Sequence, residues 1–288
     1  MTSHDVVFKA RKILKTKKIG HTGTLDPNAE GVLVLCVGKA TRMAEFLTER
    51  EKSYRAEICF GKATDTDDIT GEILRTELMS VTVEMLEEAI SHFRGRIMQV
   101  PPIYSALKKD GKKFYEYARA GERPEIAPRP ITIHQIEIED ASALPDRAII
   151  DVACSKGTYI RALCRDIGEY LGGAACMGEL LRTRVGSFLL ENAITLEALS
   201  RSESIEKYIY PIDYGMEVYP RVCATERGKR FLRSGNKLYP WNAKENYDDF
   251  SNGELIRLYD DDGFAGMGRF MTDEEKPYIK PIKIIPGD

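Results

Sequence analysis

The sequence predicts an α+β fold with a mixed, mainly antiparallel sheet, flanking helices and a small β-rich domain at the C-terminus. Segments with the alternation of strands and segments with helical spacing both occur, without the strict strand–helix–strand rhythm of a parallel sheet. After about residue 215 the texture changes to short strands, glycines and acidic turns such as Asp260-Asp261-Asp262. We therefore expect one domain over 1–214 and a second over 215–288.

The predicted helices share a capping residue or apolar side chains at helical spacing. Thr2 or Ser3 can cap a helix over 3–15, and Thr82 can cap another, because hydroxyl side chains accept from the first free N–H groups of a helix. In the segment 157–172 the apolar residues recur at intervals of three and four. The predicted helices are 3–15, a short one after Thr41, one after Thr82, and one within 157–172.

The predicted strands are of two kinds. Residues 53–60 alternate, so that Tyr54, Ala56, Ile58 and Phe60 share one face, as in a half-buried strand. Residues 32–37 are continuously apolar, which predicts a strand buried on both faces. Further strands are predicted over 130–138, 147–155 and 180–190. The segment 101–121, with its Pro-Pro, lysine-rich turn and tyrosines, is predicted to protrude from the core.

The composition is that of a globular protein, with 43% hydrophobic and 30% charged residues among 288. No apolar run approaches the roughly 20 residues that cross a bilayer, and the N-terminus lacks the apolar core of a signal peptide. We therefore expect a cytoplasmic protein without membrane association. The six cysteines include no C-x-x-C pair, which favours buried reduced thiols over disulfides or zinc. The scattered histidines do not suggest a metal site.

The net charge of −3 argues against a uniformly basic nucleic-acid-binding protein. The charge is nevertheless uneven, because six of the ten residues from Lys9 to Lys18 are basic. A local basic face can bind phosphates on a protein that is acidic overall. Charge alone equally fits a solvated helix face, so both interpretations stay open.

The segment from Gly20 to Arg42 contains the strongest candidate for a functional residue. Asp26 lies between Leu25 and Pro27 on a tight loop, and loops on rigid scaffolds often carry catalytic side chains. A single carboxylate does not suggest a glycosidase, which needs two. An Asp before Pro can also simply cap a turn. A phosphate-loop interpretation of 38–41 fails, because the glycine spacing does not match and Ala40 replaces the required Ser or Thr.

Three other residues are candidates to assist Asp26. Arg161, in the first turn of a predicted helix, could pair with Asp26 and keep it ionised. Tyr54 could stack on a base, and Tyr159 has the same potential. The alternatives are an ordinary surface arginine and ordinary tyrosines at the edge of the core.

Six motifs in order resemble the TruB family of pseudouridine synthases. They are TSHDVV with KKIGHTGTLDPNAEGVLVLCVGKATR, then KSYRAE, FGKATDTDDITGE, QVPPIYSALKKDGKKFYEYARAG, SKGTYIRALCRDIG and ELLRTRVGSF. The resemblance runs from Thr2 to about Phe188. It implies a sheet of the pseudouridine-synthase type, and the tail resembles, more weakly, a small PUA-like RNA-binding domain.

The resemblance also implies an activity, namely conversion of uridine to pseudouridine at position 55 in the T loop of tRNA. The base must be flipped out of the loop, detached from C1′, turned, and rejoined through C5. The implied catalytic residues are Asp26, Arg161 and Tyr54. Whether Asp26 attacks C1′ or removes a sugar proton stays open. The implied substrate-binding residues are His21, Tyr159, Lys39, Lys17 and Lys18.

The implied reaction needs no cofactor and no metal, and the implied partner is the T-stem-loop of tRNA. We expect a monomer without an obligate protein partner. Family members usually carry a further strand and a Lys-Pro turn before TSHDVV, so we expect a shortened N-terminus that leaves a sheet edge unpaired.

Three other interpretations remain. They are a non-catalytic RNA-binding protein, a related synthase that acts on rRNA or under a guide RNA, and a scaffold. Only an enzyme requires Asp26 beside Arg161.

Overall fold

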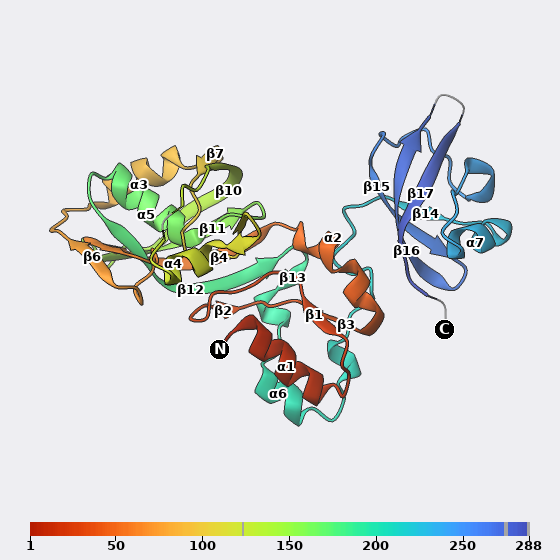
Figure 1. Ribbon diagram of the computed structural model, residues 1–288, viewed down its shortest axis with the longest axis horizontal. Coiled ribbons are helices and arrows are strands. Elements are labelled where there is room, and N and C mark those ends of the chain that lie inside the picture. Colours follow the sequence, from red (N-terminus) through yellow and green to blue (C-terminus); the bar gives the residue numbers. More distant parts are fainter. Residues whose placement is uncertain (123, 274–275, 287–288) are drawn as a thin grey trace. The chain divides into compact units, whose positions relative to one another are not determined.

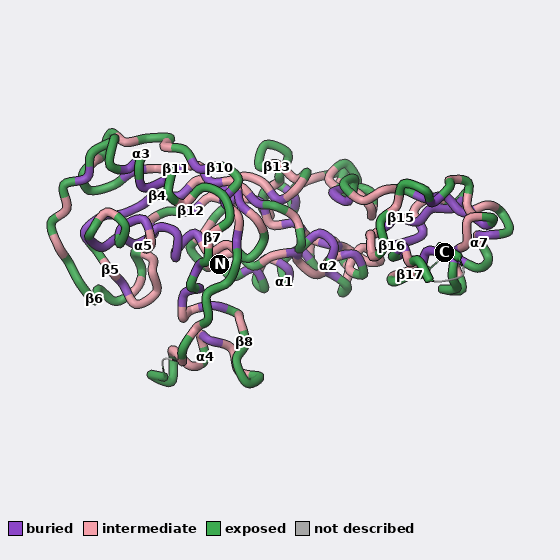
Figure 2. Tube along the Cα trace, turned by 90° about the horizontal axis from the view of Figure 1, so that it is seen from above, coloured by how far each residue is buried: buried purple, intermediate pink, exposed green. Residues whose placement is uncertain are grey.

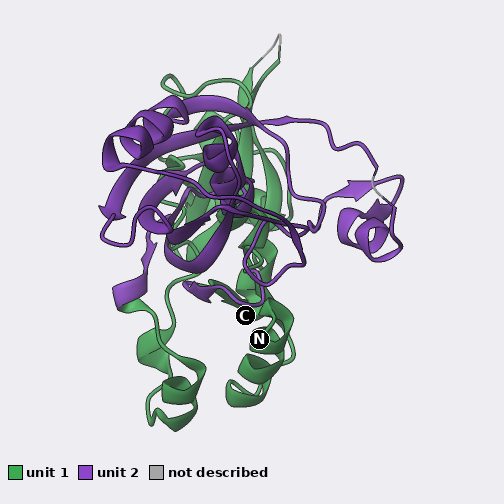
Figure 3. Ribbon diagram, turned by 90° about the vertical axis from the view of Figure 1, so that its left-hand side faces the viewer, with its two compact units in different colours: residues 1–25, 33–49, 192–288 green, residues 26–32, 50–191 purple. Residues whose placement is uncertain are grey.

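The computed structural model describes residues 1–122, 124–273 and 276–286, and its mixed helices and mainly antiparallel strands confirm the predicted α+β class (Figure 1). The chain divides into two compact units (Figure 3). The first contains residues 1–25, 33–49 and 192–288, and the second contains residues 26–32 and 50–191. Each unit has hydrophobic core residues of its own.

A seven-stranded sheet forms the centre of the second unit. Its order is β13-β12-β4-β11-β10-β7, with β2 pairing parallel to β12 and every other pair antiparallel. The alternation of residues 53–60 is confirmed, because Tyr54, Ala56, Ile58 and Phe60 all belong to the core. The strands are β2 (Glu30–Gly31), β4 (Lys52–Phe60), β7 (Gly95–Gln99), β10 (Arg129–Asp140), β11 (Arg147–Cys154), β12 (Ala175–Val185) and β13 (Phe188–Leu189).

Two helices, α3 (Val83–His92) and α5 (Ile160–Tyr170), contribute to the core on this sheet. Thr82 caps α3, since its side chain accepts from the N–H of Met85, as predicted. The apolar stripe of α5, with Leu163 and Ile167 fully buried, is also confirmed. The helix α5 places its first turn, and therefore Arg161, beside the sheet that carries Tyr54.

Two hairpins extend from this unit. The first joins β5 (Lys62–Thr64) to β6 (Ile73–Thr76). The second joins β8 (Lys108–Lys109) to β9 (Lys112–Lys113) and continues into α4 (Phe114–Arg119). Figure 2 shows β8 and α4 projecting away from the sheet, as predicted for the segment 101–121, and Phe114 is the one buried residue of α4.

The N-terminal part of the first unit is built on α1 (Ser3–Ile13) and the strand pair β1 (Ile19–His21) and β3 (Leu35–Val37). Thr2 caps α1 as predicted, because its hydroxyl accepts from Asp5 N while Asp5 accepts from Thr2 N. The chain continues through η1 (Gly38–Met43) and α2 (Ala44–Thr48), where the short helix after Thr41 was expected. After the sheet of the second unit it returns through η2 (Leu190–Asn192), α6 (Leu196–Arg201) and η3 (Glu206–Tyr208).

A four-stranded sheet in the order β14-β15-β16-β17 occupies the C-terminal part of the first unit. Its strands are β14 (Arg221–Cys223), β15 (Leu255–Asp260), β16 (Gly263–Thr272) and β17 (Pro277–Ile284). The expected β-rich texture is therefore present, but a helix, α7 (Glu226–Arg233), and the short η4 (Pro240–Asn242) were not predicted. Among the helices described for this chain, none combines the length and apolar character needed to span a membrane.

Two predicted strands have other bounds in the structure. In the run 32–37 only Leu35–Val37 is a strand, because Val32 donates to the carbonyl of Arg182 whereas Leu35 pairs with His21, so the pairing partner changes in between. Its burial also alternates, so it is not covered on both faces. The strand predicted over 180–190 is displaced, because β12 begins at Ala175 and ends at Val185. Gly186 there has φ of 54° and turns the chain back into β13, as glycine often does at the first position of a two-residue hairpin turn.

Candidate active site

The core of the site is a bidentate ion pair between Asp26 and Arg161. The Nε of Arg161 lies 2.9 Å from Oδ2 of Asp26, and its Nη2 lies 3.3 Å from Oδ1. The side chain of Arg161 is 6% exposed, whereas that of Asp26 is 37% exposed. The ion pair expected from the sequence is thus present. The arginine is enclosed, whereas the carboxylate keeps an open side for a reactant.

The guanidinium of Arg161 also fixes two further loops. Its Nη1 donates to the carbonyl of Thr66 at 2.9 Å, and its Nη2 donates to the carbonyl of Tyr104 at 2.9 Å. The five donors of an arginine lie in a rigid fork, so one side chain can hold several acceptors in fixed directions. Arg161 therefore orders three separate chain segments around the carboxylate of Asp26.

A cavity of about 580 Å³ opens beside this ion pair, within the volume range typical of ligand sites. Both Asp26 and Arg161 line it, together with side chains from the segment after Asp26, from the loop between β5 and β6, from the sheet and from the protruding segment. The other lining residues are Pro27, Asn28, Ala29, Glu57, Thr66, Asp68, Ile69, Thr70, Tyr104, Tyr115, Arg147, Met177, Gly178, Glu179 and Leu180. The carboxylate of Asp26 can therefore contact an uncharged ring in the cavity while it remains paired with Arg161.

The two candidate tyrosines lie in the same unit as Asp26. Tyr54 is 8% exposed on β4, and burial raises the pKa of Tyr54 to about 12, although the charge of Arg182 works against this. Tyr159 immediately precedes α5, and its backbone exchanges two hydrogen bonds with the amide of Gln99. Burial raises the pKa of Tyr159 as well. Both hydroxyls are therefore neutral near pH 7.

The remaining predicted contacts belong to the first unit. His21 ends β1, with its ring centroid 5.8 Å from that of His4 in an edge-on arrangement. Lys17 and Lys18 precede β1, and Lys39 lies on η1. The structure therefore brings Asp26, Arg161, Tyr54 and Tyr159 into one compact unit, while His21, Lys17, Lys18 and Lys39 are parts of the other.

A second arginine of α5 supports the site and was missed in the sequence. Arg165, one helical turn after Arg161, contacts Asp67 Oδ2 at 2.8 Å and donates to the carbonyl of Val100 at 2.9 Å. Asp67 has a φ of 60°, which is unusual for a residue with a side chain. The ion pair of Asp67 with Arg165 holds the loop whose Thr66 carbonyl accepts a hydrogen bond from Arg161. The signal available in the sequence was the spacing of two arginines by four on one helix.

Arg182 is the second residue that the sequence interpretation missed. It is 2% exposed on β12, and its Nε donates to the carbonyl of Val32 at 2.7 Å. The available signal was an arginine inside a strand whose neighbours are buried. Charged residues are almost never fully buried unless they are paired or hydrogen-bonded.

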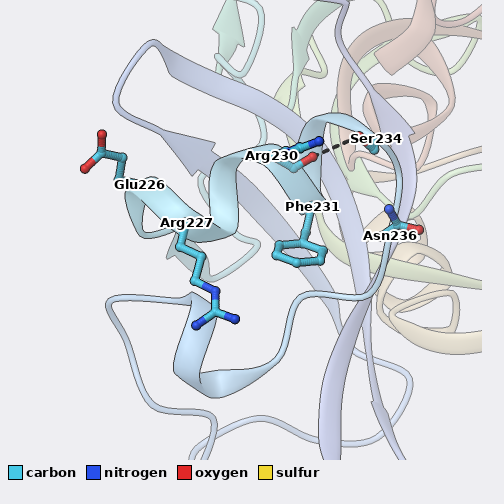
Figure 4. Close-up of a pocket in the computed structure, with 6 residues that line it drawn as sticks. All are labelled: Glu226, Arg227, Arg230, Phe231, Ser234 and Asn236. Carbon is cyan, nitrogen blue, oxygen red and sulfur yellow. Dashed lines mark hydrogen bonds between the residues drawn. The ribbon is translucent and has the colours of Figure 1, made fainter.

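A separate pocket of about 580 Å³ lies on α7, in the first unit (Figure 4). Figure 4 shows Arg227 and Phe231 on the same side of the helix, and it shows Ser234 donating to the carbonyl of Arg230. The pocket combines guanidinium, aromatic and amide groups. It is lined by Glu226, Arg227, Arg230, Phe231, Ser234 and Asn236.

Solved structures share this fold over nearly the whole chain. The chain is 27% identical to one chain of the "Crystal Structure of a Cbf5-Nop10-Gar1 Complex", with a TM-score of 0.78 over 99% of this chain and 82% of that chain. It is 25% identical to a chain of the "Crystal structure of the archaeal box H/ACA sRNP Nop10-Cbf5 complex", with a TM-score of 0.77 over 100% and 84%.

The chain belongs to the TruB family. The model of the TruB family pseudouridylate synthase N-terminal domain matches residues 11–160, and that of the tRNA pseudouridylate synthase B C-terminal domain matches residues 161–217. It is 43% identical to tRNA pseudouridine synthase B of Alkaliphilus oremlandii over 286 residues, covering 99% of this chain and 95% of that protein. It is 39% identical to tRNA pseudouridine synthase B of Bacillus subtilis over 298 residues, covering 99% and 94%.

Proposed function

We propose that this protein isomerises uridine to pseudouridine at position 55 in the T loop of tRNA. The observation that carries the proposal is the half-exposed carboxylate of Asp26, held by the buried Arg161 at a cavity of about 580 Å³. The relatives that share 39–44% of their residues with this chain are named tRNA pseudouridine synthase B, which supports tRNA as the substrate.

The chemistry begins with a uridine flipped out of the folded T loop into the cavity. Asp26 then either attacks C1′ or removes a sugar proton, and both routes need the carboxylate as an anion. The glycosidic N1–C1′ bond breaks, the uracil turns, and C5 joins C1′ as the bond to Asp26 breaks or the sugar regains its proton. C5 then loses its proton, and N1 takes one up. Tyr54 stacks on the detached base and holds it while it turns. The atoms of substrate and product balance, so the reaction requires no redox partner or group donor.

The other predicted residues serve to bind the RNA. In this proposal Tyr159 borders the flipped nucleotide, and His21 and Lys39 contact the rearranged T loop. Lys17 and Lys18, with the rest of the basic run from Lys9, neutralise phosphates and make the affinity sensitive to salt.

The same proposal assigns catalysis to a domain over 1–214 and RNA contact to a PUA-like domain over 215–288, of which the structure describes 215–273 and 276–286. The pocket on α7 fits that role, because guanidinium groups bind phosphate and an aromatic ring stacks on a base. We further propose that the protein works in the cytoplasm as a monomer, without an obligate protein partner.

The direct test is release of tritium from a T-arm minihelix that carries 5-tritiated uridine, because C5 loses its hydrogen only when the new bond forms. The wild type should release tritium, and Asp26→Asn should release none while it binds the minihelix with similar affinity. Absence of release by the folded wild type would favour a binding-only protein. Release of tritium by Asp26→Asn would show that Asp26 takes no part in the reaction.

A further inference from the structure

Arg182 is a buried cation whose position the proposed chemistry does not yet explain. It lies on β12, it is 2% exposed, and an arginine side chain remains protonated in proteins. Withdrawing a guanidinium from water is strongly unfavourable unless hydrogen bonds compensate for the lost hydration. The acceptors that surround it therefore show which parts of the structure its charge holds in place.

One acceptor belongs to the segment that follows Asp26. The Nε of Arg182 donates to the carbonyl of Val32 at 2.7 Å, and the N–H of Val32 donates to the carbonyl of Arg182 at 2.8 Å. Gly31 pairs with Arg182 in parallel register and has a φ of 106°. A Cβ at Gly31 would lie 2.2 Å from the carbonyl oxygen of Arg182, so only glycine lets the two chains approach this closely.

A second acceptor is Tyr54. Arg182 and Tyr54 are direct partners on the antiparallel strands β12 and β4, so their side chains share one face of the sheet. A hydrogen bond joins the two side chains, and the charges of both Arg182 and Asp26 act on the hydroxyl of Tyr54. One guanidinium thus connects the chain just downstream of Asp26 to the side chain of Tyr54.

We propose that Arg182 is a positioning residue for the isomerisation, which ties Tyr54 to the segment after Asp26 and so fixes the tyrosine ring relative to the carboxylate. This inference rests on the proposed function. Arg182 acts through Tyr54 and Val32 and does not touch the RNA. A misplaced ring leaves the RNA bound but places the detached base badly for rejoining, because small displacements of positioning groups slow a reaction strongly. The effect therefore falls on the rate and not on the affinity.

The test compares Arg182→Met and Arg182→Lys with matched changes at Arg184. Arg184 lies on the same strand, and its Nε also donates to a hydroxyl group. That hydroxyl belongs to Ser53, which a register shift separates from the pairing of Arg182 with Tyr54. The measurements are single-turnover pseudouridine formation at saturating enzyme, affinity for the T-arm minihelix, and thermal melting by circular dichroism. Each variant is assayed at least 10 °C below its own melting temperature.

Arg182→Met should slow the saturated rate by about 30-fold or more, the effect of losing a hydrogen-bonded charge. Its affinity for the minihelix should change by less than about threefold, and Arg182→Lys should recover part of the rate, because it restores the charge without the fork. Arg184→Met and Arg184→Lys should stay within about twofold of the wild type, because Arg184 is only partly buried and bonds to Ser53 and not to Tyr54.

The inference is overturned if folded Arg182→Met reacts at the wild-type rate, or if its whole defect lies in affinity. It is also overturned if Arg182→Met does not fold and Arg182→Lys is as fast as the wild type, since Arg182 would then be purely structural. If Arg182→Met does not fold and Arg182→Lys is folded but slow, the inference stands. A wild type that forms no pseudouridine would instead refute the proposed function, on which the inference depends.

Discussion

The bidentate pair of Arg161 with Asp26, in the second unit, and that of Arg233 with Asp260, in the first unit, use the same kind of contact for different purposes. Arg161 contacts Asp26 at 2.9 and 3.3 Å, and Arg233 contacts Asp260 at 2.6 and 2.8 Å. In the first pair the arginine is 6% exposed and the carboxylate 37%, whereas in the second the arginine is 22% exposed and the carboxylate 0%. The carboxylate is therefore the more exposed partner in the first pair, and the arginine is the more exposed partner in the second. We infer that the two pairs have different roles.

The surroundings of the carboxylates reinforce this difference. Asp260 also accepts from the N–H of Asp262 at 3.0 Å, so its oxygens serve the turn between β15 and β16. Asp26 instead borders a cavity. Its partner, Arg161, also donates to the carbonyl groups of Thr66 and Tyr104. Where the carboxylate is enclosed, as in Asp260, the pair stabilises the fold. Where the arginine is enclosed, as in Arg161, the pair presents its carboxylate for chemistry. Substitutions in each pair test whether this division holds.

Replacing the buried member of the first pair should have a very large effect on the rate. Arg161→Met leaves Asp26 without its cation and frees three loops, so the saturated rate should fall by about 100- to 1,000-fold, as for a broken buried pair. Quench-flow or tritium-release kinetics measure this rate. Arg161→Lys keeps the charge without the fork and should lie between Arg161→Met and the wild type. Equal rates for Arg161→Met and the wild type would show that the pair is structural.

The same kind of change in the second pair should affect stability and not the rate. Asp260→Asn breaks a buried ion pair, so the free energy of unfolding should fall by about 2–4 kcal/mol. Urea denaturation of the C-terminal sheet, followed through Trp241, measures this loss. Lys229→Met, which removes only the exposed contacts to Asp261 and Asp262, should leave the urea midpoint unchanged. A stable Asp260→Asn variant would contradict the structural role.

The pH dependence of stability should reveal the burial of Tyr54. Its pKa in the folded protein is about 12, above the value near 10 of an exposed tyrosine. The folded state therefore holds a proton that the unfolded state loses, and this contribution is full below about pH 10 and declines as the pH rises towards 12. The contribution is at most about 2–3 kcal/mol. Tyr54→Phe should reduce the fall in stability between about pH 10 and 12, and an unchanged pH slope would place the hydroxyl in solvent.

Local features of the fold could be predicted from the sequence because their causes are local. Thr82 caps α3 within one turn, and the alternation through Tyr54 and Phe60 follows from the geometry of a single strand. The predicted strand over 32–37 was wrong in its length because the cause lies elsewhere in the chain. A short apolar run does not reveal where its pairing partner changes, and here the change falls between Val32 and Leu35.

The candidate site was predicted in part. Asp26 and Arg161 stood out as a loop carboxylate and a helix-terminal cation, but they are 135 residues apart, and no local signal pairs them. Arg182 was missed because its acceptor, Val32, lies 150 residues away. The helix α7 was missed because charged side chains dominate it, although Thr225 caps it through Gly228 N. Partners supplied by tertiary structure are not visible in local sequence patterns.

One measurement tests the contrast between the two pairs most directly. Asp26→Asn and Asp260→Asn, with the same chemical change, are assayed side by side for pseudouridine in a T-arm minihelix, at a temperature where both are folded. Asp26→Asn should bind the minihelix and form no product, and Asp260→Asn should form product at the wild-type rate despite its lower stability. Product from folded Asp26→Asn would contradict the assignment of Asp26 as the reacting carboxylate.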